Sequence, residues 1–182
     1  MTQQVAQAGA MAPAAGAGVR GWDPVVRLFH WTVVAGCVLN LFVREAGELP
    51  HEIVGYVVAA ALAIRIVWGF VGTKHARFSD FVPTPSRLNA YVAALLRGRE
   101  PRVLGHNPAG AVMMLALMAL LAGVSVTGWM TTLDAFWGED WLEGLHEGLA
   151  NAILVLALLH AAAALFESWR HRENLVWAMV TG

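Results

Sequence analysis

The sequence contains one cysteine, Cys37, among its 182 residues. A single cysteine excludes an intrachain disulfide, and it also excludes the C-x-x-C-H motif that attaches haem covalently. Charge is scarce as well, with 14% of residues charged and a formal net charge of −1. Such a chain attracts no polyanion, which excludes a basic nucleic-acid-binding domain. The apolar content of 58% excludes a disordered chain and favours a small integral membrane protein.

Four apolar stretches are long enough to cross a bilayer core, which takes about 20 helical residues. Their expected bounds are residues 25–43, 53–72, 109–130 and 145–166. The amphipathic helices of a soluble bundle would carry polar stripes, and these stretches have none. The sequence therefore predicts an all-α fold, an integral membrane four-helix bundle.

The chain divides into two expected parts. Residues 1–21 are rich in Ala, Gly and Gln and lack the features of a signal peptide, so we expect a disordered N-terminal tail. Residues 22–182 form the helical domain. Within it, an amphipathic helix is expected at about 85–98, with Ser86 as its N-cap and arginines beside its apolar face. This helix either lies on the inner membrane surface or packs against the bundle.

The basic residues gather on one side of the predicted membrane. They occur near both termini and in the long connection between the second and third spans, whereas Arg44 stands alone on the opposite side. The positive-inside rule therefore predicts that both termini are cytoplasmic. The two outer connections are acidic instead.

Four of the seven histidines lie in or at the ends of the predicted spans. His30 and His160 fall near the inner ends, and His51 and His146 fall near the outer ends. His146 and His160 are fourteen residues apart, which is four whole turns at the 3.5-residue period of a left-handed bundle. Both imidazoles therefore face the same side of the fourth span. Arg65 follows His51 by the same spacing, so it is expected to point into the bundle at the inner depth.

Two pairs of facing imidazoles, at two depths, are the ligands that two haems b need when each iron is held non-covalently by two histidines. Iron with both axial positions filled suits electron transfer. The alternatives are a structural hydrogen bond at any one histidine, or zinc, which prefers three or four ligands at one point. His75, His106 and His171 lie at or beyond the inner boundary, where solvated or headgroup-facing roles are expected. Room for the porphyrins would come from small residues near the ligands: Gly36, Gly55, Gly144, Gly148 and Ala150.

These residues resemble the bacterial cytochrome b561 family, which is related to the cytochrome b subunits of nickel-iron hydrogenases. The resemblance extends from Gly21 to the C-terminus. Its motifs are Trp22-Asp23-Pro24-Val25-Val26-Arg27-Leu28-Phe29-His30-Trp31, Gly105-His106-Asn107-Pro108, Leu145-His146-Glu147 and Leu158-Leu159-His160-Ala161.

The resemblance implies a multi-pass protein of the bacterial inner membrane with two haems b. It places the inner haem on His30 and His160 and the outer haem on His51 and His146, the same pairing that depth alone predicts. Arg65 matches a family arginine that would meet a haem propionate.

Two functions of different class follow. The first is a stand-alone oxidoreductase linked to the quinone pool, with Lys74, His75 and His106 as candidate quinone contacts. The second is a non-catalytic anchor and electron relay for a hydrogenase, a dehydrogenase or a c-type cytochrome. The acidic outer connections suit docking of a basic partner such as a cytochrome c. A haem-free metal or proton transporter is a third reading. Lipid is an expected partner and nucleic acid is not, while the oligomeric state stays open.

Overall fold

The computed structural model describes residues 23–45, 47–99, 107–172 and 174–181, apart from the side chains of His75 and His171. The predicted tail and His106 lie outside these residues. The described chain is helical, with four helices long and apolar enough to cross a bilayer. Their bounds are α1 Pro24–Phe42, α2 Leu49–Val71, α5 Pro108–Thr131 and α6 Asp140–His171. The prediction of an all-α protein with four spans is confirmed.

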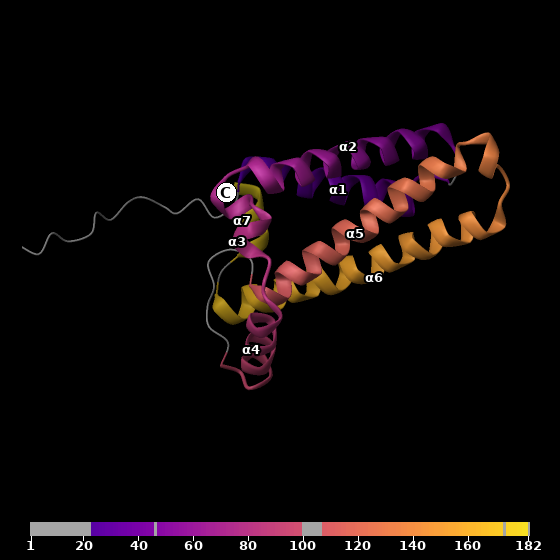
Figure 1. The fold of residues 1–182 in the computed structure, drawn as a ribbon. Helices are drawn as coiled ribbons and strands as arrows, with labels where there is room; N and C mark the ends of the chain where they lie inside the picture. Colours follow the sequence, from indigo (N-terminus) through magenta and orange to yellow (C-terminus); the bar gives the residue numbers. More distant parts are fainter. Residues whose placement is uncertain (1–22, 46, 100–106, 173, 182) are drawn as a thin grey trace, which may run out of the picture.

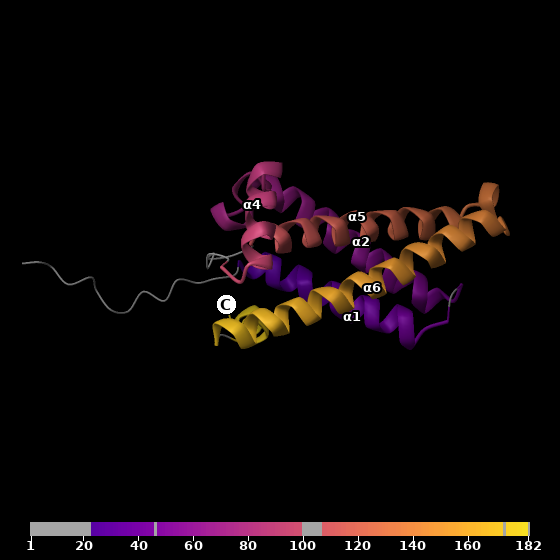
Figure 2. The ribbon, with the colours of Figure 1, turned by 90° about the horizontal axis from the view of Figure 1, so that it is seen from below.

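Shorter elements close the two ends of the bundle (Figure 1). One end, which we call the α4 end, carries η1 Lys74–Ala76, α3 Phe78–Phe81, α4 Pro85–Leu96 and α7 Leu175–Thr181. The other end, which we call the loop end, consists of the connections 43–48 and 132–139, with η2 Asp134–Phe136 in the second. In Figure 2 the four long helices again run between these two ends.

Proline and a capping side chain mark where several helices begin. Asp23 and Asn107 accept hydrogen bonds from backbone N–H groups at the starts of α1 and α5, and each is followed by proline. At α4 the N-cap is Thr84, whose Oγ1 accepts from the Arg87 N–H at 3.3 Å. The prediction of Ser86 as N-cap is therefore wrong. Proline suits the first helical position because it has no N–H, so the cap is the residue before Pro85.

The fourth span is longer than its apolar stretch predicts. Helix α6 has 32 residues and ends where Arg172 adopts a positive φ of 54°. Hydropathy marks only the part of a helix that matches the bilayer core, and the polar turns at both ends of α6 continue the same helix. Helix α4 ends at Leu96 rather than near residue 98.

The long helices pack as two hairpins, α1 with α2 and α5 with α6, joined by packing of α2 against α5. Their common core is apolar and lies between the two ends: Val58, Leu62, Met118, Leu121 and Ile153. The outer faces are apolar and exposed, as in Leu28 at 71% and Leu165 at 61%, which suits contact with lipid chains. Along the described residues, α6 does not pack closely against α1 or α2.

Asp23 joins the start of α1 to the end of α2. Its Oδ1 accepts from Trp68 Nε1 at 3.1 Å, and its Oδ2 accepts from Thr73 Oγ1 at 2.7 Å. Partial burial acts to raise the pKa of this carboxyl, but the hydrogen bond from Thr73 and those from three other donors outweigh it. The pKa of Asp23 therefore lies below its ordinary value.

Helix α7 is held on the first turns of α1. Arg27 Nε donates to the Met179 carbonyl at 3.3 Å, and Trp31 Nε1 donates to the same oxygen at 3.1 Å. A second Arg27 nitrogen donates to the Val180 carbonyl. These carbonyls lie at the C-terminal end of α7, where a cation is favoured. Helix α4 packs against α5 and buries Tyr91, so the packing role expected for it is present.

Candidate functional site

His30 and His160 face each other at the α4 end. His30 lies in the second turn of α1 and His160 lies eleven residues before the end of α6. Their ring centroids are 6.5 Å apart and their planes are tilted by 58°. His30 Nδ1 is buried and has no hydrogen-bond partner among the described residues. The two side chains thus come from a helix pair that does not pack closely.

His51 and His146 face each other at the loop end. Each lies near the N-terminus of its helix, α2 and α6 respectively. Their ring centroids are 6.3 Å apart and their planes are tilted by 62°. The His51 backbone carbonyl accepts from Asn40 Nδ2 at 3.0 Å, which ties the start of α2 to α1. His146 Nδ1 lies 3.0 Å from Thr127 Oγ1 of α5.

The structure therefore brings together both histidine pairs that depth predicts. The two pairs span the gaps between α6 and its neighbours α1 and α2, because α6 packs on α5 instead. Within the described residues, no group of three or more His, Cys, Asp or Glu side chains converges as a metal site.

A cavity of about 920 Å³ opens around the loop-end pair. This volume lies in the range of cofactor pockets. The two histidines line it, and so do small residues from all four long helices: Gly36, Gly55, Gly128 and Ala150. Polar and acidic side chains also line it: Asn40, Glu52, Tyr56, Thr131, Glu143, Glu147 and Asn151.

The expectation for Gly144 and Gly148 is wrong. Both glycines are exposed and neither lines this cavity. Each is two residues from His146, and two residues turn an α-helix by about 200°, so these positions point away from the imidazole. Gly36 lines the cavity and also brings α1 close to α2, since a Cβ there would lie 2.3 Å from Val58 Cγ2.

Arg65 is fully buried near the α4 end, with 0% of its surface exposed. None of its three guanidinium nitrogens has a hydrogen-bond partner among the described residues. Its Cζ lies 5.3 Å from the centroid of the Phe78 ring, which supplies a cation–π contact. The charge of the Asp23 carboxylate also acts on it. That carboxylate uses its hydrogen bonds on Trp68 and Thr73.

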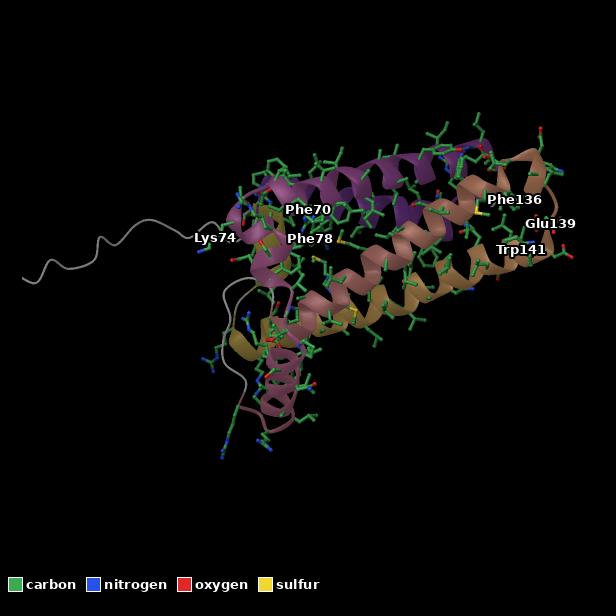
Figure 3. All side chains as sticks on the ribbon, in the orientation of Figure 1. Phe70, Lys74, Phe78, Phe136, Glu139 and Trp141 are labelled. Carbon is green, nitrogen blue, oxygen red and sulfur yellow. The ribbon has the colours of Figure 1, made fainter. Side chains whose placement is uncertain are left out.

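The surroundings of Arg65 are aromatic on one side. Phe78 contacts Phe70 with ring centroids 5.3 Å apart, and both side chains gather beside the α4-end helices in Figure 3. Gly69 allows this approach, since a Cβ there would lie 2.1 Å from the Phe78 ring. A buried guanidinium with five unmet donors is costly unless an anion meets it.

Sequence reasoning missed Thr127, Gly128 and Phe78. Thr127 and Gly128 lie in a span without charged residues, and nothing in the local pattern indicates that they meet His146. Phe78 follows the end of α2 in a polar stretch, where an aromatic residue gives no sign of folding back over Arg65.

Comparison with known proteins identifies the family of this chain. The family described as "Prokaryotic cytochrome b561" matches residues 21–182. A "Probable Ni/Fe-hydrogenase B-type cytochrome subunit" of Rhodobacter capsulatus is 26% identical, over 88% of this chain and 79% of the relative. A protein of the same name from Azotobacter vinelandii is also 26% identical, over 88% and 86%. "Cytochrome b562" of Cereibacter sphaeroides is 26% identical, over 88% and 95%. No solved structure matches the chain.

Proposed function

Because this chain belongs to the prokaryotic cytochrome b561 family, we propose that it carries electrons across the membrane on two haems b and exchanges them with the quinone pool. Membership makes the chain a multi-pass membrane cytochrome of b type, as its four apolar helices also indicate. The haem number, the ligands and the quinone link are the proposal.

The spacing of the two histidine pairs carries the proposal. A bond from an imidazole nitrogen to a metal is about 2 Å, and the nitrogen lies roughly 1 Å from the ring centre, so two imidazoles on one metal have centroids roughly 6 Å apart. Two directly hydrogen-bonded imidazoles would have centroids roughly 5 Å apart. The observed 6.5 Å and 6.3 Å match the first arrangement and exceed the second.

Buried polar atoms support the same proposal. Buried groups without partners are rare and call for an explanation. Arg65 has three such nitrogens and lies in the last turns of α2, toward the α4 end. A haem propionate there would accept two parallel hydrogen bonds from its guanidinium. At the loop end, the cavity of about 920 Å³ reaches both His51 and His146 and has the room a macrocycle needs.

In this proposal, His30 and His160 hold one iron and His51 and His146 hold the other. When bound, each haem supplies a site that gains and loses one electron, with no open coordination position. The chain itself holds the ligands at two depths and separates them by an apolar layer. Val58, Leu62 and Leu121 belong to that layer, which keeps water and protons out of the space between the two pairs.

The sidedness follows from the basic residues. The α4 end carries Lys74, Arg77, Arg87, Arg97 and Arg99 on its connecting segments, so the proposal places it in the cytoplasm. The loop end, with Glu45, Glu48 and Asp134, then faces the outer side of the bacterial inner membrane.

A second candidate function is an electron-relay subunit for a hydrogenase. Its support is the name "Probable Ni/Fe-hydrogenase B-type cytochrome subunit" of several relatives that this chain matches over most of its length. Purification under mild conditions distinguishes the candidates, since a relay subunit co-purifies with a peripheral redox chain and a stand-alone quinol oxidoreductase does not.

The decisive experiment counts haems. The purified protein should yield about two haems b per chain by pyridine haemochrome, and acid–organic extraction should remove all of them, because the single cysteine precludes the covalent motif. A count of one haem, or haem that stays on the chain, contradicts the two-pair proposal. A haem-free protein favours the transporter reading instead.

A further inference from the structure

Helix α5 provides no histidine to either pair, yet two neighbouring residues of α5 contact His146. Thr127 Oγ1 lies 3.0 Å from His146 Nδ1. A Cβ on Gly128 would lie 2.9 Å from His146 Cε1 and 3.4 Å from Nδ1. The imidazole therefore rests against the bare backbone of one residue and the hydroxyl of the other.

The hydroxyl hydrogen of Thr127 is already used. Its Oγ1 lies 2.9 Å from the Gly123 carbonyl and 3.2 Å from the Val124 carbonyl, both one turn earlier in α5. A carbonyl oxygen only accepts, so the single hydroxyl hydrogen points to these oxygens. Thr127 is 6% exposed, which leaves little access for solvent to alter this arrangement.

The direction of the hydrogen bond between Thr127 and His146 follows. Because the hydroxyl donates to a carbonyl, its oxygen must accept from His146, and Nδ1 must carry the proton. A neutral imidazole carries one proton, so Nε2 has a free lone pair. Such a nitrogen can bind a metal without first losing a proton.

We propose that Thr127 is a positioning residue for His146. Its hydroxyl selects the imidazole form with a free Nε2, orients the ring toward His51 and tunes the potential of the loop-end haem. This inference rests on the proposed function, because it takes His146 as a haem ligand. A hydrogen bond from the second ring nitrogen of a ligand fixes its tautomer and makes the metal-binding nitrogen more basic. A more basic ligand favours ferric iron and lowers the potential.

Two of the other proposed ligands lack a hydrogen bond of this kind at Nδ1. The Nδ1 atoms of His30 and His51 are buried without a hydrogen-bond partner in the described part of the chain. Because Thr127 contacts a histidine of the loop-end pair, its effect is expected at the loop-end haem, and the α4-end haem of the same molecule serves as an internal control.

The experiment compares two substitutions at one position in the purified holoprotein. Thr127→Val keeps the shape and removes the hydroxyl, whereas Thr127→Ser keeps the hydroxyl and removes a methyl group. Each variant is titrated potentiometrically, and its haem retention is measured by transfer to apomyoglobin. Thr127→Val should raise the potential of the loop-end haem and weaken its retention by roughly 10- to 100-fold. Thr127→Ser should match the wild-type protein, and the α4-end haem should not change in either variant.

Gly128→Ala provides a second test of positioning. The added methyl group must displace the imidazole, so the loop-end haem should be lost while the α4-end haem remains. Full retention of both haems in Gly128→Ala would contradict the close fit on which the positioning role depends.

The outcomes distinguish this inference from the proposed function. If both Thr127 variants behave like the wild-type protein, or both lose the loop-end haem equally, the hydroxyl has no positioning role and the inference is overturned. If His146→Ala retains two haems with unchanged potentials, His146 is not a ligand and the proposed function itself fails.

Discussion

The two histidine pairs have nearly equal ring separations but opposite electrostatic surroundings. At the α4 end, the fully buried cation Arg65 lies in the last turns of α2, which packs against the helix that carries His30. At the loop end, the cavity around the pair is lined by Glu52, Glu143 and Glu147. A nearby cation disfavours ferric iron and raises a haem potential, and nearby carboxylates do the reverse. In the two-haem proposal, the two haems therefore differ in potential although their ligands are the same, and the higher potential is expected at the α4 end.

The aromatic residues at the two ends also differ in how far they shield the nearby charges from solvent. At the α4 end, the Phe78 ring lies over the Arg65 guanidinium, and Phe70 packs against Phe78 (Figure 3). At the loop end, Phe136 and Trp141 contact each other with centroids 6.4 Å apart, and Trp141 is exposed beside acidic side chains. The first cluster shields a charge from solvent, and the second leaves the charges in contact with it. The α4-end charge should therefore act more strongly and depend less on salt.

The largest expected effect is the loss of one haem at a time. His30→Ala and His160→Ala should each remove the α4-end haem, and His51→Ala and His146→Ala should each remove the loop-end haem, because each iron needs both of its ligands. Haem content should fall by about half in every variant. Redox titration identifies which component is missing. The pairing is wrong if His30→Ala and His51→Ala remove the same component.

The second-largest effect is expected from substitution of Arg65. Arg65→Leu removes a buried positive charge near the α4-end haem, so its potential should fall by on the order of 59 mV, a tenfold change for one electron, or its occupancy should drop. The loop-end haem should stay as it is. Arg44→Leu, at an exposed position of the loop end, is the control for loss of a cation. Snorkelling of Arg65 toward headgroups would instead leave both potentials unchanged.

A smaller effect is expected from the loop-end carboxylates. The double variant Glu52→Gln and Glu147→Gln should raise the loop-end potential, by less than Arg65→Leu lowers the other, because solvent and salt screen these groups. Titration at low and high salt measures the difference, which should shrink as salt increases. An equal shift of both haems would show that the two sites are not separated electrostatically.

The smallest expected effect is a loss of stability at the α4 end, where Asp23 joins α1 to α2. Asp23→Ala removes the N-cap of α1 and the acceptor for Trp68 and Thr73, so stability should fall by about 1 kcal/mol. Because the pKa of Asp23 is lowered, its stabilising effect is present at neutral pH and is lost as the pH falls through that lowered value. Thermal unfolding of Asp23→Ala and of the exposed control Asp134→Ala, at pH 7 and in acid, measures both effects. A wild-type melting temperature in Asp23→Ala contradicts this role.

Much of the fold could be predicted because its signals are local. The four spans follow from hydropathy, and α1 and α5 begin within one residue of the starts that hydropathy predicts. The errors are local as well. The local pattern predicts Ser86 as the cap, but the residue before Pro85 occupies the N-cap position. Closeness in sequence to His146 predicts a role for Gly144 and Gly148, but both occupy a different face of the helix from His146.

The sequence by itself determined the four apolar helices, the family, and the end of the bundle near which each of the four paired histidines lies. Hydropathy, caps and a fourteen-residue period are properties of single helices, so they can be read without a neighbour. Only the tertiary structure decided that Phe78 covers Arg65 and that Thr127 meets His146. Both contacts depend on how one element is rotated and placed against another. That rotation results from side-chain packing between elements, which no single stretch of sequence encodes.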